Sequence, residues 1–197
     1  MVQTKDDLFQ GLRNYSTDER KVEFIEAAIR KGMPTEVKIT ALAIRAEIYK
    51  NKKWFNTAAK DYCSAADLAP TFREKIDLYF KAANLFLVAG DYFGADDNFR
   101  KVLVLASQEQ KIALQKKIHI LYIEHAQKYE QDRKYSKAIK AFSRILSMKI
   151  SFDKKLEIYD KLSAMYEKIG RPREAAHMQE HKENLIEHKK EKGLIKV

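Results

Sequence analysis

Residues that interrupt or cross-link a chain are scarce in this sequence, which has one cysteine, three prolines and six glycines among 197 residues. An all-β fold needs a turn every 8 to 12 residues or so, and so few glycines and prolines argue against one. A single cysteine also excludes a framework of disulfides within the chain. A reducing compartment is the simplest setting, and we expect a cytoplasmic protein.

Long apolar runs are lacking too. The longest nearly uninterrupted one lies within Ala82–Gly90, whereas a helix that spans a bilayer needs roughly 20 apolar residues. The opening stretch, MVQTKDDLFQ, contains two acids and no apolar run, which is unlike a secretory signal. The sequence therefore predicts no membrane span.

Motifs that carry chemistry are missing as well: there is no glycine-rich phosphate loop, dinucleotide fingerprint or paired-cysteine metal motif. His177 and His181 are four residues apart, but no cluster of carboxylates or cysteines completes a usual ligand set, so we interpret them as solvent-facing. Cys63 has no histidine within helical reach and is interpreted as a small buried apolar residue rather than a nucleophile. We expect no catalytic, cofactor-binding or metal site, and no enzyme activity.

The sequence does contain a repeat of small and aromatic residues. Most of its steps are 3 or 4, which keeps side chains on one face of a helix. The pattern returns after shifts of 37, 43 and 37 residues and fades in the last copy. The copies are Leu42, Ala46, Tyr49, Phe55, Ala58, Tyr62, Ala65 and Pro70; Tyr79, Ala83, Phe86, Tyr92, Ala95, Phe99 and Val102; Tyr122, Ala126, Tyr129, Tyr135, Ala138, Phe142 and Ile145; and Tyr159, Ser163, Tyr166, Pro172 and Ala175.

Each copy predicts a helical hairpin, because small residues let two helices approach closely and the neighbouring aromatics fill the groove beside them. Such hairpins stack and share a core. Helix-end signals support this interpretation: Gly90 and Gly170 stand where the first helix of a hairpin should end. Capping boxes are predicted at Ser16-x-x-Glu19, Thr71-x-x-Glu74 and Ser107-x-x-Gln110.

The repeat resembles the tetratricopeptide repeat family, most clearly in Ala46-x-x-Tyr49 and in the aromatic and small residues from Phe55 to Ala65. The resemblance covers about residues 39–176. It implies an all-α fold, an α-α superhelix that forms a right-handed solenoid as one domain over residues 1–197. Its parts would be N-terminal capping helices in 1–34, hairpins in 35–70, 71–107, 108–150 and 151–192, and a short tail in 193–197.

Some positions depart from the family pattern. The repeat shifts exceed the family's usual length of about 34 residues, and the hairpins are in that respect similar to the longer ones of soluble SNARE-attachment proteins. Lys53 and Arg133 stand where the family prefers glycine, and Arg45 and His125 where it prefers leucine.

Members of the family bind protein segments on the concave face, which comes from the first helix of each hairpin. The resemblance implies a non-catalytic scaffold or adaptor that holds a protein partner there, on a surface with an apolar centre. Glu47 stands where chaperone-tail binders of this family need a cation or amide, so that partner is not expected. The implied groove consists of Glu47, Lys50, Asn51, Phe80, Asn84, Leu87, Val88, Ile123, Gln127 and Glu130.

Positive charge is concentrated in one part of the sequence. The net charge is +10, and ten basic against three acidic residues give +7 between residues 111 and 150. Such a cluster favours an anionic partner, so the alternative function is a ribonucleoprotein-associated factor that binds RNA or the ribosome through the third hairpin. An ordinary solvated face explains the same charges, and the oligomeric state is left open. The candidate patch is Lys116, Lys117, Lys128, Arg133, Lys134, Lys137, Lys140, Arg144 and Lys149.

Overall fold

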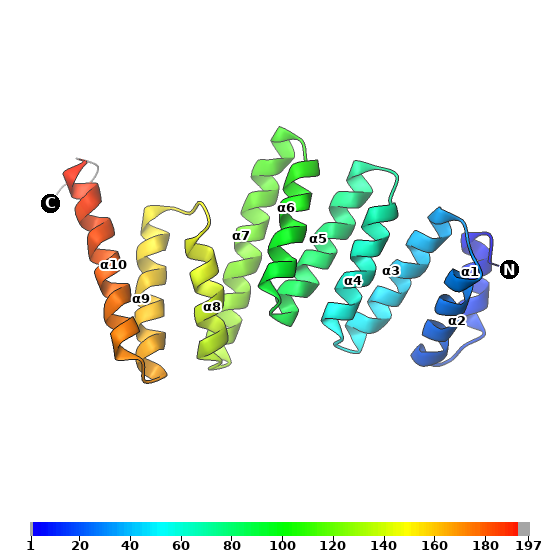
Figure 1. Ribbon diagram of the computed structural model, residues 1–197, viewed down its shortest axis with the longest axis horizontal. Coiled ribbons are helices and arrows are strands. Elements are labelled where there is room, and N and C mark those ends of the chain that lie inside the picture. Colours follow the sequence, from blue (N-terminus) through cyan, green and yellow to red (C-terminus); the bar gives the residue numbers. More distant parts are fainter. Residues whose placement is uncertain (1, 193–197) are drawn as a thin grey trace. The chain divides into compact units, whose positions relative to one another are not determined.

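The computed structural model describes residues 2–192, and this part of the chain contains ten α-helices and no β-strand. The predicted all-α fold class is confirmed. The helices, coloured along the chain in Figure 1, are α1 (Lys5–Arg13), α2 (Asp18–Arg30), α3 (Thr35–Asn51), α4 (Phe55–Leu68), α5 (Phe72–Ala89), α6 (Tyr92–Leu105), α7 (Gln108–Gln131), α8 (Tyr135–Leu146), α9 (Phe152–Lys168) and α10 (Pro172–Glu191).

The chain divides into two compact units, with the boundary inside α7. Unit 1 extends to Gln115 and unit 2 begins at Lys116. None of the ten helices of residues 2–192 combines the length and the apolar character that crossing a bilayer requires. The right-handed superhelix and the single domain over the whole chain stay predictions.

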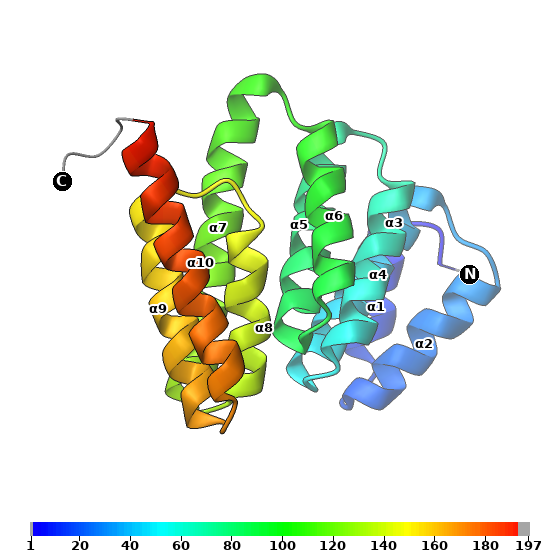
Figure 2. The ribbon, with the colours of Figure 1, turned by 60° about the vertical axis from the view of Figure 1, so that its left-hand side comes forward.

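In unit 1, consecutive helices from α3 to α6 pack side by side, as the views in Figures 1 and 2 both show. The alanines of the repeat lie at the centre of this packing. Ala46 of α3, Ala58 and Ala65 of α4, Ala83 of α5 and Ala95 of α6 are all 0% exposed. Because an alanine presents only a methyl group, two helix backbones can approach closely at each of these positions. The small-residue pattern is therefore confirmed as the helix-packing surface of unit 1.

Unit 2 uses the same pattern. Helix α9 packs against both α8 and α10. Tyr122 and Ala126 of α7 and Ala138 of α8 are 0% exposed, and Phe142 of α8 is 2% exposed. The aromatics fill the space beside the small residues, as the repeat predicts.

The helix ends agree with most of the predicted signals. Gly90 caps α5 in the left-handed conformation with φ of 81°, and Gly170 follows α9 with φ of 73°. Ser107 and Gln110 form both bonds of a capping box, and the Thr71 hydroxyl accepts from the Glu74 amide. The prediction at Ser16 is wrong: Thr17 caps α2, accepting from the Arg20 amide at 3.4 Å.

Arg45 joins three helices of unit 1 through a mostly buried ion pair. Its Nε and one terminal nitrogen donate to the two carboxylate oxygens of Asp61 in α4, each at 2.7 Å, and the other terminal nitrogen lies 3.3 Å from Glu26 of α2. The side chain of Asp61 is only 9% exposed. The hydrogen bonds with Asp61 raise the pKa of Arg45 against the opposing effect of burial. A charged residue at a leucine-preferring position thus has a specific partner.

Candidate functional site

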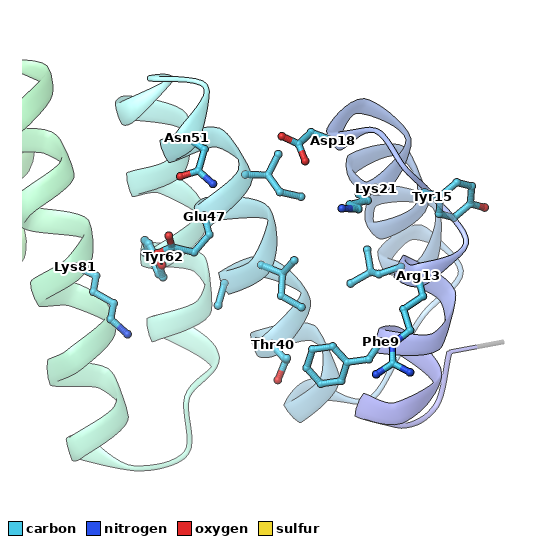
Figure 3. Close-up of a pocket in the computed structure, with 14 residues that line it drawn as sticks. Phe9, Arg13, Tyr15, Asp18, Lys21, Thr40, Glu47, Asn51, Tyr62 and Lys81 are labelled. Atoms are coloured by element: carbon cyan, nitrogen blue, oxygen red, sulfur yellow. Dashed lines mark hydrogen bonds between the residues drawn. The ribbon is translucent and has the colours of Figure 1, made fainter.

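A groove with a volume of about 780 Å³ opens on unit 1 and is shown in Figure 3. Helices α1 to α4 and the segment between α1 and α2 supply all but one of its lining residues, and α5 supplies the remaining one. The lining residues are Phe9, Leu12, Arg13, Tyr15, Asp18, Lys21, Thr40, Ala43, Ile44, Glu47, Ile48, Asn51, Tyr62 and Lys81.

The apolar part of the groove comes from α1 and α3. Phe9 and Leu12 lie one helical turn apart on α1, and Ile44 and Ile48 lie one turn apart on α3. Leu12 and Ile48 are buried, whereas the Phe9 ring keeps 44% of its surface exposed. Removing such an exposed ring from water is favourable, so Phe9 offers an apolar contact to a ligand in the groove.

Cations outnumber anions among the lining residues that have no ion pair. Within residues 2–192, Arg13 and Lys21 have no carboxylate partner, and neither does Asp18. Lys81 is already paired with Asp77 at 2.7 Å. Figure 3 places Arg13 on the same helix as Phe9, with Lys21 on the next helix. The groove therefore combines an apolar contact with two cations and one anion that form no ion pair, which leaves an excess of positive charge.

Glu47 is the acidic residue that α3 contributes to the groove in Figure 3, and its carboxylate already has partners within the protein. It accepts hydrogen bonds from the Tyr62 hydroxyl and from the Lys50 ammonium. Burial pushes the pKa of Glu47 upward, but the bonds from Lys50 and Tyr62 outweigh it and lower the pKa. Burial, and after it the hydrogen bond to Glu47, raises the pKa of Tyr62. Glu47 thus stays ionised and is satisfied within the protein.

The structure separates the residues predicted for the groove in unit 1. Glu47 and Asn51 line it, and Lys50 reaches it through its ion pair with Glu47. Phe80 packs edge-to-face on Phe99 of α6, with ring centroids 5.4 Å apart. These two aromatics lie within the α5–α6 hairpin.

Three further predicted residues belong to α5. Leu87 is 0% exposed, so its assignment to a binding surface is wrong: it packs in the core. Asn84 is half-buried. Val88 lines a different cavity, of about 440 Å³, together with Trp54.

The remaining predicted groove residues lie in unit 2. Ile123 and Gln127 are half-buried on α7. Glu130 forms an ion pair with Lys161 of α9 at 2.9 Å. A protein-binding role for these three residues stays a prediction.

Sequence reasoning missed the contribution of α1, which supplies Phe9, Leu12 and Arg13 to the groove. One signal marks this helix: Thr4 and Asp7 form a complete capping box at its start. That signal locates the helix but does not tell which helix it packs against.

The predicted basic patch lies entirely in unit 2, and all nine of its side chains are exposed. Lys137, Lys140 and Arg144 follow one face of α8, whose opposite face buries Ala138 and Phe142. Helix α8 is the one helix of residues 2–192 without an aspartate or glutamate. We call this set of nine residues the basic face.

Two of the three acidic residues between Lys116 and Lys149 are already paired. Asp132 pairs with Lys134 at 2.9 Å, and Glu130 is taken by Lys161. From Arg133 to Phe152 the chain has six basic residues and no acidic one. Burial lowers the pKa of His119, and burial followed by the charge of Lys128 lowers that of His125. These two histidines are neutral at pH 7, so the charge of the face comes from lysine and arginine.

Cys63 is held within unit 1. Its thiol lies 3.1 Å from the side-chain oxygen of Asn98 on α6, to which it donates. Burial raises the pKa of Cys63 to about 11. Because the thiolate is the reactive form of cysteine, this side chain is unsuited to nucleophilic chemistry at neutral pH.

Comparisons with known proteins return solved structures of low sequence identity. No family model matches the chain, and no curated protein matches it. Two structures of MamA are similar at 16% and 15% identity, covering 98% and 99% of this chain and 96% and 99% of theirs, with TM-scores of 0.43 and 0.42. A structure of BtubC (BKLC) from P. vanneervenii is similar at 12% identity and a TM-score of 0.36, covering 93% of this chain and 77% of that one.

Proposed function

We propose that this protein is a non-catalytic, cytoplasmic scaffold of tetratricopeptide-like architecture, and that the groove of unit 1 holds a segment of a protein partner. The observation that carries the proposal is the groove of about 780 Å³, which is lined by the exposed Phe9 ring and by Arg13 and Lys21, two cations without an ion pair. Most protein sites for segments of this kind combine apolar anchors with a few polar groups that fix orientation.

The composition of the groove also specifies the chemistry of the partner. An apolar side chain would pack on Phe9 and Ile44, and a carboxylate would lie between Arg13 and Lys21. Glu47 is satisfied by Tyr62 and Lys50, so it does not demand a cation from the partner. The partner segment is therefore amphipathic and acidic.

A displayed library of random peptides selected on the purified chain tests this function. We expect the selected peptides to be enriched in acidic and large apolar residues. Phe9→Asp and Arg13→Glu should each weaken the best peptide at least about tenfold, a loss of about 1.4 kcal/mol of binding free energy. Phe9 and Arg13 are both exposed, so these variants should remain folded, which circular dichroism checks.

Two matched controls lie outside the groove in the same unit. Phe93 is 83% exposed on α6, and Arg20 is exposed on α2. Phe93→Asp and Arg20→Glu should leave peptide affinity within about twofold, since neither residue lines the groove. If the controls weaken binding as much as the groove variants do, the groove is not the binding site.

A second function is favoured by the basic face of unit 2: binding of a structured RNA, alone or within a ribonucleoprotein. Six basic residues without an intervening acid suit a phosphate backbone, whose affinity comes largely from counterion release. The aromatics of α8 do not offer a stacking platform, because Phe142 is buried and Tyr135 is half-buried beneath Lys168. Backbone recognition therefore fits this face better than the reading of single-stranded bases.

The test is a salt titration with a double-stranded RNA hairpin as the probe. Reversing Lys137, Lys140 and Arg144 to glutamate should abolish binding and reduce the salt slope by up to about one per lost phosphate contact. Reversing the exposed Arg173, Lys190 and Lys192 of unit 2 makes the same change in net charge away from α8. If both triple variants lose the same RNA affinity, the effect comes from net charge alone, and the basic face is not a specific RNA-binding site.

A further inference from the structure

Helix α10 brings two imidazoles together on its exposed side. His177 and His181 are one helical turn apart, and their Nε2 atoms lie 3.0 Å from each other. Their rings are inclined at 64° with centroids 4.2 Å apart. At this distance either one nitrogen donates a hydrogen bond to the other, or the lone pairs of both nitrogens point toward one shared position.

Neighbouring side chains hold both rings. Nδ1 of His177 is 3.4 Å from a carboxylate oxygen of Glu180, to which its N–H donates. This bond leaves Nε2 of His177 as the nitrogen with a free lone pair, an arrangement that carboxylates commonly impose on metal-binding histidines. The His181 ring is stacked on Tyr159 of α9, at 6.0 Å and 19°.

The lysine that follows His181 in the sequence does not oppose a cation at this position. Lys182 follows His181, but its ammonium is held by both carboxylate oxygens of Asp160, at 2.6 and 2.8 Å. The charge of that lysine is thereby compensated. His177 is 59% exposed, so an ion can reach the pair from solvent.

We propose that His177 and His181 form a two-histidine surface site for a divalent transition metal ion, with cupric or nickel ion preferred over zinc. Imidazole nitrogens bind such ions at about 2.0 to 2.1 Å. Two nitrogens 3.0 Å apart would then subtend an angle of about 95° at the ion. That angle matches neighbouring positions of a square-planar or octahedral ion, as cupric and nickel ions prefer. A tetrahedral zinc ion would separate the nitrogens to about 3.3 Å.

The site supplies two ligands, and water or a bound molecule supplies the others. Residues 2–192 contain no group of three or more histidine, cysteine, aspartate or glutamate side chains placed around one ion. Binding requires Nε2 of both rings to be unprotonated, so the proton of His181 moves to its Nδ1 through solvent. The ring stays neutral, and the ion replaces the hydrogen bond between the two nitrogens.

Calorimetric titration of the untagged chain with cupric, nickel and zinc ions tests the proposal. We expect one cupric ion per chain, with nickel bound more tightly than zinc. His177→Gln and His181→Gln should each weaken cupric binding at least about tenfold, because one imidazole then replaces a chelating pair. Electron paramagnetic resonance of the cupric complex should show two equatorial nitrogens in the unchanged chain and one in each variant.

His188 provides the matched control on the same helix. It is exposed and faces Glu191 at 4.0 Å, but no histidine lies four residues from it. His188→Gln should bind cupric ion as the unchanged chain does, and all three variants should keep the same helical content. Absence of stoichiometric binding, full retention of binding in both pair variants, or an equal loss in the His188 variant would each overturn the site. Tightest binding of zinc would overturn the proposed geometry.

Discussion

The first hairpin of unit 1, α3–α4, and the α7–α8 hairpin follow the same pattern of residues eighty positions apart, yet they differ in chemistry. Ala46 and Ala126 are both 0% exposed, as are Ala58 and Ala138. Lys53 and Arg133 both take left-handed backbone conformations, with φ of 62° and 55°. The buried alanines and the turn are thus shared by the two hairpins.

The two hairpins differ at other positions, both in the ion pairing beside these alanines and in the charge of the exposed helix faces. Arg45 and Asp61 form a buried ion pair in unit 1, whereas their counterparts in the other hairpin are a neutral His125 and the buried Ala141. The exposed face of α4 carries Thr57, Lys60 and Ser64 where that of α8 carries three cations, Lys137, Lys140 and Arg144. Packing constrains the small residues, and the exposed positions are free to specialise.

The largest effect is expected where the hairpins are alike. Ala95→Arg in unit 1 and Ala138→Arg in unit 2 place a guanidinium between packed helices at positions that are 0% exposed. Each should destabilise the fold by more than about 4 kcal/mol, which is the range of severe core disruption. Thermal unfolding followed by circular dichroism measures the loss.

Ala176→Arg is the control for this pair, because Ala176 is exposed on α10. It should change the free energy of unfolding by less than about 0.5 kcal/mol. An unchanged melting curve for either core variant would contradict the assignment of these alanines to the helix contacts.

The second-largest loss of stability is expected at the ion pair that only the α3–α4 hairpin contains. Asp61→Ala leaves the Arg45 guanidinium largely buried without its main partner, which should cost about 3 to 5 kcal/mol. Chemical denaturation measures this loss. His125→Leu at the corresponding position of α7 removes no ion pair and should cost less than about 1.5 kcal/mol.

A double variant separates the lost pair from lost packing. In Arg45→Leu with Asp61→Ala no charge is left buried and unpaired, so most of the stability lost in Asp61→Ala should return. A double variant as unstable as the single one would show that the ion pair matters through its shape rather than through its charge.

These comparisons show what sequence spacing can predict. The buried alanines and aromatics were predictable because steps of 3 and 4 define a helix face without knowledge of the partner helix. Of the predicted groove residues only Glu47 and Asn51 line the groove of unit 1, because the α1 residues that line it carry no repeat signal. Leu87 was misassigned because α5 is apolar on several sides, so periodicity does not single out its core face. The pairing of Arg45 with Asp61 depends on how two helices are rotated, which spacing does not give.

A smaller effect concerns the shared turn. Lys53 and Arg133 adopt a conformation that costs a residue with a side chain about 1 to 2 kcal/mol relative to glycine. Lys53→Gly and Arg133→Gly remove this cost, but glycine also has more freedom in the unfolded chain, which offsets part of the gain. Each substitution should therefore stabilise the protein by about 1 kcal/mol. Lys52→Gly, one residue earlier at φ of −76°, should instead destabilise it slightly. Denaturation midpoints of the three variants decide between these signs, and a loss of stability in both φ-positive variants would contradict the assigned turn.

The smallest change in stability is expected at Cys63 and its counterpart Ser143, and it shows how differently the two positions are exposed. Cys63 has a pKa raised to about 11 by burial, whereas Ser143 is exposed. Ser143→Cys should therefore give a thiol with an ordinary pKa of about 8.5 that leaves stability nearly unchanged. At pH 8, iodoacetamide should modify Cys63 about a hundredfold more slowly than Cys introduced by S143C, since the thiolate is the reacting form.

The raised pKa of Cys63 also makes the stability of the fold depend on pH. The folded state holds the Cys63 proton more tightly than the unfolded chain does. The corresponding contribution to stability is present below the unfolded pKa of about 8.5 and is lost as the pH rises through about 11. The alkylation rate of Cys63 should keep rising throughout that range, while the rate at position 143 levels off above about pH 9. Equal rates and equal plateaus would mean that Cys63 is not enclosed between α4 and α6, and that its hydrogen bond to Asn98 does not persist in solution.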